Sequence, residues 1–311
     1  MYCDCAPRGI RIMETKTKTP PRGQTQHQDI ESRIGAELRD IGIPPRPAIL
    51  TRIEAEMRKD EPDFKLLADI ISSDMGLAAS VIKVSNSAYF GVGRRVRTIL
   101  EALFILGLKL TVTTIAGIAL QRAFPNVPNL DRFWEASSRM ARVSGWLTQR
   151  LKGRVGFRPE DAYTFGLFRD CGMPVLMIPF SEYRQILHAA ESDRERLFTD
   201  IEDEQLSINH AIVGAELAED WMLPVDICEG IRHHHDISAI SGNMVGKVPE
   251  NASRYIALTM VAQHLIQRYT DLYPDQEWHK LGPASLSLLQ IQPKELAELA
   301  TEAEEVVNAT L

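Results

Sequence analysis

The sequence predicts an all-α protein, and three observations support this prediction. Apolar residues recur at three- and four-residue steps from Asp29 onward, which is the spacing of a helix with one buried face. No segment shows the apolar–polar alternation of a half-buried strand, and no repeat recurs at a solenoid period. Hydrophobic residues make up 44% and charged residues 25% of the 311 residues, so the chain can bury a substantial core.

The chain begins with a segment that shows no hydrophobic period. Residues 1–28 are polar and rich in Thr, Pro, Lys and Arg, so we expect a disordered tail, and translation could start at Met1 or Met13. A first helix is expected over Asp29–Ile41, and the Gly42–Pro47 stretch ends it. The helical period resumes after this break.

The next expected helices are short and clearly separated. Ile49 begins one of them, Pro62-Asp63 opens another, and Asp74 is expected to cap the N-terminus of a third. A polar loop follows from Asn86 to Arg97, and it is the clearest internal seam of the chain. Because Ser and Gly are too sparse there for a flexible linker, we expect two helical subregions packed into one compact unit.

The remaining part of the chain is expected to be helical apart from a loop at Ile237–Pro249. The expected helices are Thr98–Phe124, Leu130–Leu151, Pro159–Ile178, Asp193–Leu206, Ile208–Trp221, Val225–His235, Ala252–Tyr269 and Leu286–Ala309.

The charge and the apolar runs of the chain indicate its cellular location and the classes of partner it can bind. The formal net charge of -7 disfavours nucleic acid and anionic membranes as partners, so no DNA binding is expected. The most apolar run, Ile99–Leu120, is interrupted by Glu101 and Lys109, and we therefore expect no membrane span. Cys171 and Cys228 are expected to be buried free thiols in a reducing compartment. These observations predict a cytoplasmic protein.

Three clusters of polar residues could carry chemistry. The first is the run from Arg232 to Asp236, which contains three consecutive histidines at the end of an expected helix. Neighbouring helical residues point about 100° apart, so at most two of these histidines can face one pocket. Basic residues at a helix C-terminus are also favoured by the helix dipole, and the run taken alone favours that structural role.

The other two clusters lie in apolar helices. His210 stands on a helix whose apolar face includes Ile212 and Leu217, and a single histidine there is more often a core residue than a ligand. Arg169 and Asp170 are expected inside an apolar helix, where a buried carboxylate needs a partner. An ion pair between them is the first expectation, and a ligand role for Asp170 is the alternative.

Several motifs follow one another along the chain, and together they resemble one known family. They are Ile43-Pro44-Pro45-Arg46-Pro47, Ile70-Ile71-Ser72-Ser73-Asp74, Asn86-Ser87-Ala88-Tyr89-Phe90-Gly91, Ile99-Leu100-Glu101-Ala102-Leu103, Phe133-Trp134, Gly166-Leu167-Phe168, His210 to Leu217, and Trp221-Met222-Leu223-Pro224 with the histidines after it. In this order they resemble the HDOD domain, the HD-related output domain of bacterial signalling proteins. The resemblance implies a compact HD-like helical bundle with an N-terminal helical subregion over residues 29–276, and a helical extension over 277–311 packed on the same unit.

The resemblance also implies where a metal site would lie. The HDOD domain is similar to HD-type phosphohydrolases, including HD-GYP cyclic-di-GMP phosphodiesterases, which hold metal ions with His and Asp ligands and attack phosphate with metal-bound water. Four positions of that pattern are retained here and are candidate metal ligands. They are Asp170, His210, His234 and His235.

Three expected ligands are absent from this chain. Ala136 or Ser137 stands where the pattern has a histidine, Arg169 replaces the histidine of the His-Asp doublet, and Gln263 lies near the C-terminal aspartate position. The Gly-Tyr-Pro loop is also absent after His235. Because a guanidinium stays charged, Arg169 favours an ion pair with Asp170 over a divalent cation. We therefore expect no catalytic residue and no cofactor, and residual metal binding is a separate prediction.

The loop after Asn86 offers a further candidate site. Asn86 and Ser87 are expected to bond the local backbone, because Asn and Ser side chains often do so in loops. Alternatively, these two residues and Arg94, Arg95 and Arg97 could form an anion-binding edge.

The resemblance favours a non-catalytic bacterial signal-transduction protein that regulates an unknown signalling partner through protein–protein contact, with a homodimer also open. One alternative is a metal-dependent phosphohydrolase of a nucleotide or cyclic dinucleotide. Another is a sensor that binds a nucleotide without turnover.

Overall fold

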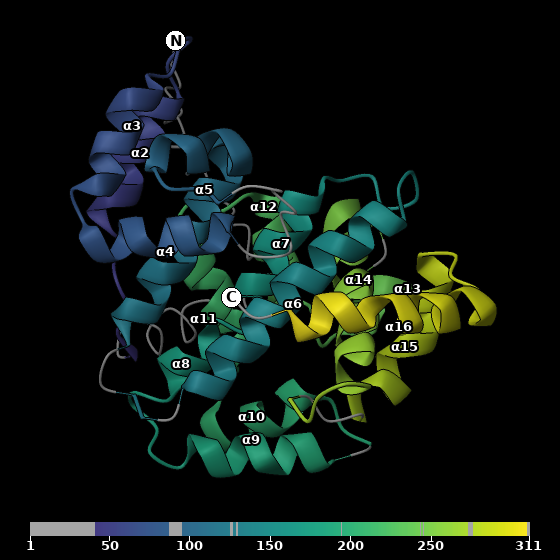
Figure 1. The fold of residues 1–311 in the computed structure, drawn as a ribbon. Coiled ribbons are helices and arrows are strands. Elements are labelled where there is room, and N and C mark those ends of the chain that lie inside the picture. The colour runs from purple at the N-terminus through teal and green to yellow at the C-terminus, as the bar shows by residue number, and fades with distance from the viewer. Residues whose placement is uncertain are drawn as a thin grey trace, which may run out of the picture. The chain divides into compact units, whose positions relative to one another are not determined.

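A computed structural model describes residues 41–311 of the protein, except for 87–94, 125–126, 129, 194, 243, 245, 273–275 and 310–311. These residues form helices joined by short connections, without an extended strand among them (Figure 1). The all-α prediction is therefore confirmed. The predicted tail and nearly all of the predicted helix Asp29–Ile41 lie outside the described residues.

The first described helices begin where the sequence predicts them. They are α2 (Ala48–Met57), α3 (Phe64–Ser72) and α4 (Met75–Ser85). The Asp63 side chain accepts hydrogen bonds from the first turn of α3, and Asp74 accepts one from the Leu77 backbone N–H in α4. Each cap satisfies N–H groups that have no partner within the helix, which fixes where the helix begins.

Asn86 closes the loop after α4. Its side-chain amide donates to the Val96 carbonyl at 2.9 Å, and its side-chain oxygen accepts from the Val96 N–H at 2.7 Å. This pair of bonds joins the two ends of the loop and supports the backbone-bonding role expected for Asn86. The Asn86→Ala variant is expected to lose about 1–2 kcal/mol of unfolding free energy, measured by urea denaturation. An unchanged midpoint would contradict this role.

Helix α5 (Ile99–Ala123) is interrupted within its length. Gly107 has φ 71° and ψ 167°, a conformation that a residue with a Cβ rarely adopts. One continuous helix over Thr98–Phe124 was expected from the sequence, and the break at Gly107 corrects that expectation. Among the described helices, α5 alone is long and apolar enough to cross a membrane, although half of its most apolar window is buried within the protein. Core helices of globular proteins meet the same criteria.

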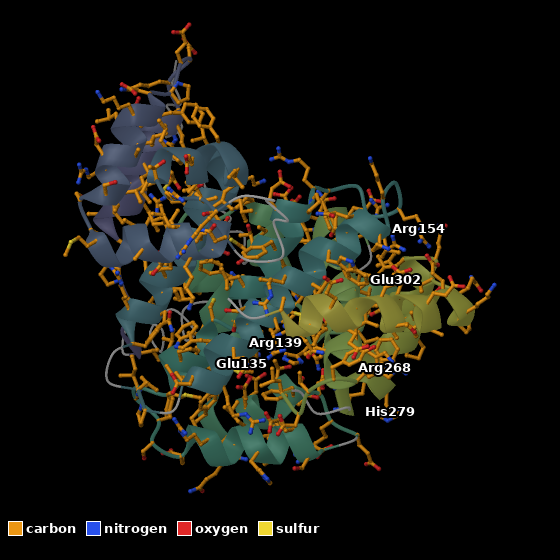
Figure 2. The ribbon with its side chains drawn as sticks, viewed as in Figure 1. Glu135, Arg139, Arg154, Arg268, His279 and Glu302 are labelled. Carbon is orange, nitrogen blue, oxygen red and sulfur yellow. The ribbon has the colours of Figure 1, made fainter. Side chains whose placement is uncertain are left out.

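Most of the remaining helices contact the helix next to them in the sequence, and the final helix packs on α6 (Figure 1). Arg150, at the end of α6, pairs with Glu302 of the final helix at 2.5 Å, and Arg154 pairs with Glu295. Figure 2 labels Glu302 and Arg154, one residue of each pair. These helices are α6 (Asp131–Arg150), α7 (Pro159–Phe168), α8 (Gly172–Leu176), α9 (Tyr183–Ser192), α10 (Phe198–Leu206), α11 (His210–Asp220), α12 (Val225–Arg232), α13 (Ser238–Ser241), α14 (Glu250–Gln267), α15 (Gln276–Leu288) and α16 (Pro293–Asn308).

Three predicted elements differ from the structure. The expected helix Pro159–Ile178 is divided into α7 and α8, and the expected helix Leu286–Ala309 lies across α15 and α16. The expected loop Ile237–Pro249 contains α13, and α9 was not predicted. The break between α7 and α8 matters most for function, because it places Arg169, Asp170 and Cys171 in a turn. Cys171 and Cys228 are buried and free, as predicted.

Candidate metal centre

Four side chains from three separate parts of the chain converge at one point. Asp170, His210, His234 and His235 each offer one ligand atom, and these atoms all lie within 4.8 Å of one another. All four residues are buried. The structure therefore brings together the four retained positions that the sequence analysis singled out.

Close helix packing positions two of these residues. Gly172 begins α8 and lies against the start of α11, so closely that a Cβ at this position would overlap the His210 carbonyl oxygen. A Cβ at Gly214 of α11 would in turn lie 3.1 Å from the Gly172 backbone nitrogen. This glycine contact holds the turn that carries Asp170 next to the first residue of α11, His210.

The other two residues follow the end of α12. This helix ends at Arg232, and His234 and His235 lie in the turn after it. Two of the three consecutive histidines belong to the cluster, which agrees with the expectation that at most two of them can face one pocket. His233 instead lies near Glu229, with 3.8 Å between His233 Nε2 and a carboxylate oxygen. His234 and His235 thus converge with Asp170 and His210, whereas His233 does not.

The hydrogen bonds of the histidines fix their protonation. Nδ1 of His210 lies 2.7 Å from a Glu202 carboxylate oxygen, and Nδ1 of His235 lies 2.9 Å from one of Glu277. Nδ1 of His234 lies 2.7 Å from the Ile231 carbonyl oxygen. Carbonyl and ionised carboxylate oxygens only accept, so each Nδ1 carries a proton and donates it. In the neutral imidazoles, each Nε2 then presents a lone pair to the centre.

The spacing of these lone pairs fits a metal ion. His210 Nε2 lies 3.2 Å from Nε2 of His234 and 3.2 Å from Nε2 of His235. His234 Nε2 lies 3.2 Å from an Asp170 oxygen. A tetrahedron with zinc–nitrogen bonds of about 2.0–2.1 Å has edges of about 3.3 Å. Three of the six donor–donor distances are thus close to this edge, and all six are at most 4.8 Å, which is compact enough for the four side chains to approach one divalent cation.

The electrostatics of the cluster favour the ligand form of Asp170 and of His234, but not that of His210. Burial would raise the pKa of Asp170, but Arg169 and His234 hold it well below its usual value. Burial and the neighbouring His235 lower the pKa of His234 to about 3. Burial opposes protonation of His210 as well, although Glu202 raises its pKa above the usual value. Asp170 is thus ionised and His234 neutral, as a metal ligand must be.

Arg169 and Asp170 form the ion pair that the sequence analysis expected. Arg169 Nη2 donates to Asp170 Oδ2 at 2.9 Å, and Nε lies 3.1 Å from Oδ1. The pairing leaves Oδ1 3.2 Å from His234 Nε2, so the same carboxylate faces both the guanidinium and the histidines. An ion pair with Arg169 and a ligand role for Asp170 were expected to be alternatives. The geometry makes them compatible.

A cavity of about 500 Å³ opens beside the cluster. Asp170 and His235 line it on one side, and Arg169 lies in the same wall. The other two positions where the HD pattern lost a ligand also line it, through Ala136 and Ser137 for one and Gln263 for the other. The positions that differ from a hydrolase thus share this cavity with two of the four retained positions, Asp170 and His235.

The anion-binding edge proposed for the loop after α4 does not contribute to this cluster. Arg95 and Arg97 are exposed, and Asn86 bonds Val96. Ser87 and Arg94 lie outside the described residues.

The carboxylates that orient the histidines were missed by the sequence analysis. Glu202 is fully buried, accepts from the His210 backbone N–H at 3.2 Å, and accepts from the Tyr183 hydroxyl. Glu277 accepts from Lys280 at 3.3 Å, and His235 lowers its pKa to about 2 against the effect of burial. The histidines and their carboxylates come from different helices, so no local spacing in the sequence joins them.

The Glu277→Gln variant tests whether the carboxylates that accept from the histidines contribute to metal binding. An uncharged amide in place of the carboxylate makes His235 a poorer donor to a metal, and the affinity is expected to fall about 10–100-fold. Competition with a chelating dye measures the change. Glu298→Gln on exposed α16 is the matched control, and equal affinities in the two variants would contradict the role of Glu277.

Comparisons with known proteins agree with the fold. A crystal structure of a proposed phosphohydrolase from Shewanella amazonensis SB2B is 23% identical, with a TM-score of 0.64, and the match covers 88% of this chain and 95% of that one. An HDOD domain protein of unknown function from Geobacter sulfurreducens is 22% identical, with a TM-score of 0.60, over 89% of this chain and 99% of that one. At these identities the likeness shows the fold alone.

Two further comparisons concern the extent and family of the chain. An uncharacterized protein of Treponema pallidum (strain Nichols) is 25% identical over 217 residues, which are 69% of this chain but only 41% of that protein. This chain thus matches less than half the length of that relative. The family model of the HDOD domain matches residues 43–237, which is more than half of the chain. The protein therefore belongs to the HDOD domain family.

Proposed function

We propose that the protein is a non-catalytic signal-transduction module that binds one divalent metal ion through Asp170, His210, His234 and His235. The observation that carries this proposal is the number of protein donors that meet at the centre. Four donors complete the tetrahedral set of a structural zinc-type site, whereas a catalytic site keeps a position for water or substrate. The metal would hold α8, α11 and the turn after α12 together.

Arg169 supports the non-catalytic part of the proposal. In hydrolases of this fold a metal-bound water attacks phosphate, and a second metal needs a neutral donor beside the first. Here the Arg169 guanidinium places a permanent positive charge against both carboxylate oxygens of Asp170. That charge competes with a second cation for the same carboxylate. The chain's own residues would therefore bind one ion, with Arg169 beside its carboxylate ligand.

Exposed apolar side chains support action through protein contact. Phe104 is 69% exposed and Val225 70% exposed, and the Phe104 ring stacks on Phe64 with centroids 5.2 Å apart. Large apolar side chains at the surface are typical of protein-binding sites when they gather. A signalling partner, a cytoplasmic location and a homodimer remain proposals.

A metal-dependent phosphohydrolase is the second candidate. The cavity of about 500 Å³ beside His235 and Asp170 favours it, because a phosphate there would meet both Arg169 and the metal. The same space would serve a sensor that binds a nucleotide without turnover.

A hydrolysis assay separates these candidates. The protein is loaded with Mn²⁺ or Zn²⁺ and offered bis-p-nitrophenyl phosphate, p-nitrophenyl phosphate and cyclic di-GMP. We expect the release of product to equal that of the His210→Ala variant with every substrate. Metal-dependent release that the His210→Ala variant lacks would establish a hydrolase and overturn the non-catalytic proposal.

A further inference from the structure

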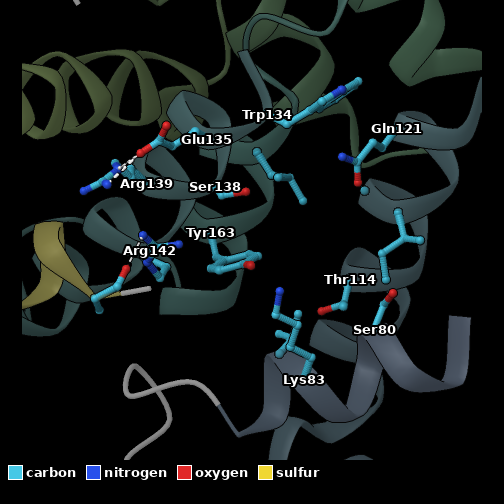
Figure 3. Close-up of a pocket in the computed structure, with 15 residues that line it drawn as sticks. Ser80, Lys83, Thr114, Gln121, Trp134, Glu135, Ser138, Arg139, Arg142 and Tyr163 are labelled. Carbon is cyan, nitrogen blue, oxygen red and sulfur yellow. Dashed lines mark hydrogen bonds and ion pairs between the residues drawn. The ribbon is translucent and has the colours of Figure 1, made fainter. Parts of the chain in front are cut away.

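Figure 3 shows a second cavity, of about 440 Å³, whose lining includes none of the four residues of the histidine cluster. Helices α4, α5, α6 and α7 contribute its lining. Trp134 and Leu167 provide half-buried apolar surface, and hydroxyl groups such as that of Thr114 lie among them. The lining thus combines apolar surface with several polar and charged groups, which can orient a small molecule.

The charges of this cavity are unbalanced. Its lining holds three cationic side chains, Lys83, Arg139 and Arg142, but only one carboxylate, Glu135. Glu135 is already engaged by Arg139, whose Nη2 lies 2.7 Å from its carboxylate oxygen. Lys83 and Arg142 therefore lack a carboxylate partner in the lining. In a chain with a net charge of -7, such a local excess of positive charge is not a general property of the surface.

Arg142 carries the strongest signal. The residue is 4% exposed, and its Nε has no hydrogen-bond partner among the described residues. Burial lowers the pKa of this guanidinium, which is the direction expected for a charge without a counter-ion. A buried charged donor without an acceptor is costly, so structures normally provide one.

The end of α16 accounts for only part of this arrangement. Arg142 Nη2 donates to the Ala309 carbonyl at 2.9 Å, and Arg139 donates to the Val307 carbonyl. Cations at a helix C-terminus are favoured by the helix dipole, so both arginines help to end α16. That role leaves the Nε of Arg142 without an acceptor. It also does not involve Lys83, which reaches from α4 toward Tyr163 across the pocket (Figure 3).

We propose that this cavity binds a small organic anion with an apolar body, its acid group held by Arg142 and Lys83. The apolar body lies against Trp134 and Leu167, and a carboxylate, sulfonate or phosphate supplies an anionic partner for the Arg142 guanidinium and the Lys83 ammonium. This site is separate from the metal centre, although α6 lines both cavities, through Ser137 in one and Ser138 in the other. Its test does not depend on metal binding.

Two fluorescent probes that differ in charge test the proposal on the full chain. 8-Anilinonaphthalene-1-sulfonate is an aromatic anion, and N-phenyl-1-naphthylamine is its uncharged counterpart. We expect the Lys83→Gln variant to raise the dissociation constant of the sulfonate about fivefold, as the loss of a partly exposed ion pair would. The affinity for the uncharged probe is expected to stay unchanged. Lys65→Gln, an exposed lysine on α3, is the matched control and should bind both probes as the wild type does.

A second variant addresses the buried partner. Arg142→Gln keeps a polar side chain but removes the charge, and sulfonate affinity is expected to fall about tenfold or more. Circular dichroism verifies its folding, and if Arg142→Gln does not fold, the exposed Lys83→Gln variant decides alone. Sulfonate binding that Lys83→Gln leaves unchanged, or that it weakens no more than binding of the uncharged probe, would overturn the proposal.

Discussion

The Gly172→Ala variant is expected to lose about 3 kcal/mol or more of unfolding free energy, the largest stability effect predicted for a single methyl group in this chain. A Cβ at Gly172 would overlap the carbonyl oxygen of His210 and would lie 2.7 Å from the backbone nitrogen of Gly214. Both obstacles are backbone atoms, so no side-chain rotation can relieve them. Helices α8 and α11 would have to separate, and Asp170 would move away from His210.

Gly76→Ala is the matched control for this variant. A Cβ at Gly76 would meet the end of the Arg122 side chain, which is flexible and half-exposed. The helix α4 should also gain from alanine, so a change within about 1 kcal/mol is expected. Urea denaturation of both variants measures the difference. If Gly172→Ala were as stable as Gly76→Ala, the close packing of α8 on α11 would be wrong.

Binding of a metal ion is expected to raise the melting temperature of the wild type, and the His210→Ala variant is expected to lose this response. An ion present at a hundred times its dissociation constant stabilises the folded state by about 2.7 kcal/mol when it binds only that state. His210 is central because its Nε2 lies 3.2 Å from the Nε2 of both His234 and His235. Removing the imidazole therefore takes away the donor shared by the cluster.

His188→Ala provides the control for nonspecific metal binding. This histidine is exposed on α9, outside the cluster, so its variant should respond to Zn²⁺ as the wild type does. Differential scanning fluorimetry with and without EDTA measures all three proteins. A stabilisation of His210→Ala equal to that of the wild type would place the ion elsewhere.

Local patterns made the helix starts and the ligand positions predictable. Asp63 and Asp74 precede their helices in the sequence and cap them in the structure, because capping depends on residues only two or three positions apart. The positions Asp170, His210 and His234 were found by the order of motifs along the chain, and the structure brings them together.

Features that depend on distant packing were not predictable. The break after Phe168 lies in an apolar segment that has the period of a continuous helix, and the contact of Gly172 with α11 overrides that period. Glu202 and Glu277 looked like ordinary surface carboxylates, because nothing in their own segments indicates the histidine each one meets. Local sequence patterns therefore identify candidate metal ligands, but not the carboxylates that hold a proton on Nδ1 of His210 and His235.

The metal content of the purified protein tests the central claim most directly. The claim is that three Nε2 atoms and one carboxylate oxygen form one complete metal site. Inductively coupled plasma mass spectrometry, after exposure of the chain to Zn²⁺ and extensive dialysis, is predicted to find one ion per chain. The His234→Ala, His235→Ala double variant is predicted to retain none. A wild type without stoichiometric metal, or a double variant that keeps it, would contradict the account.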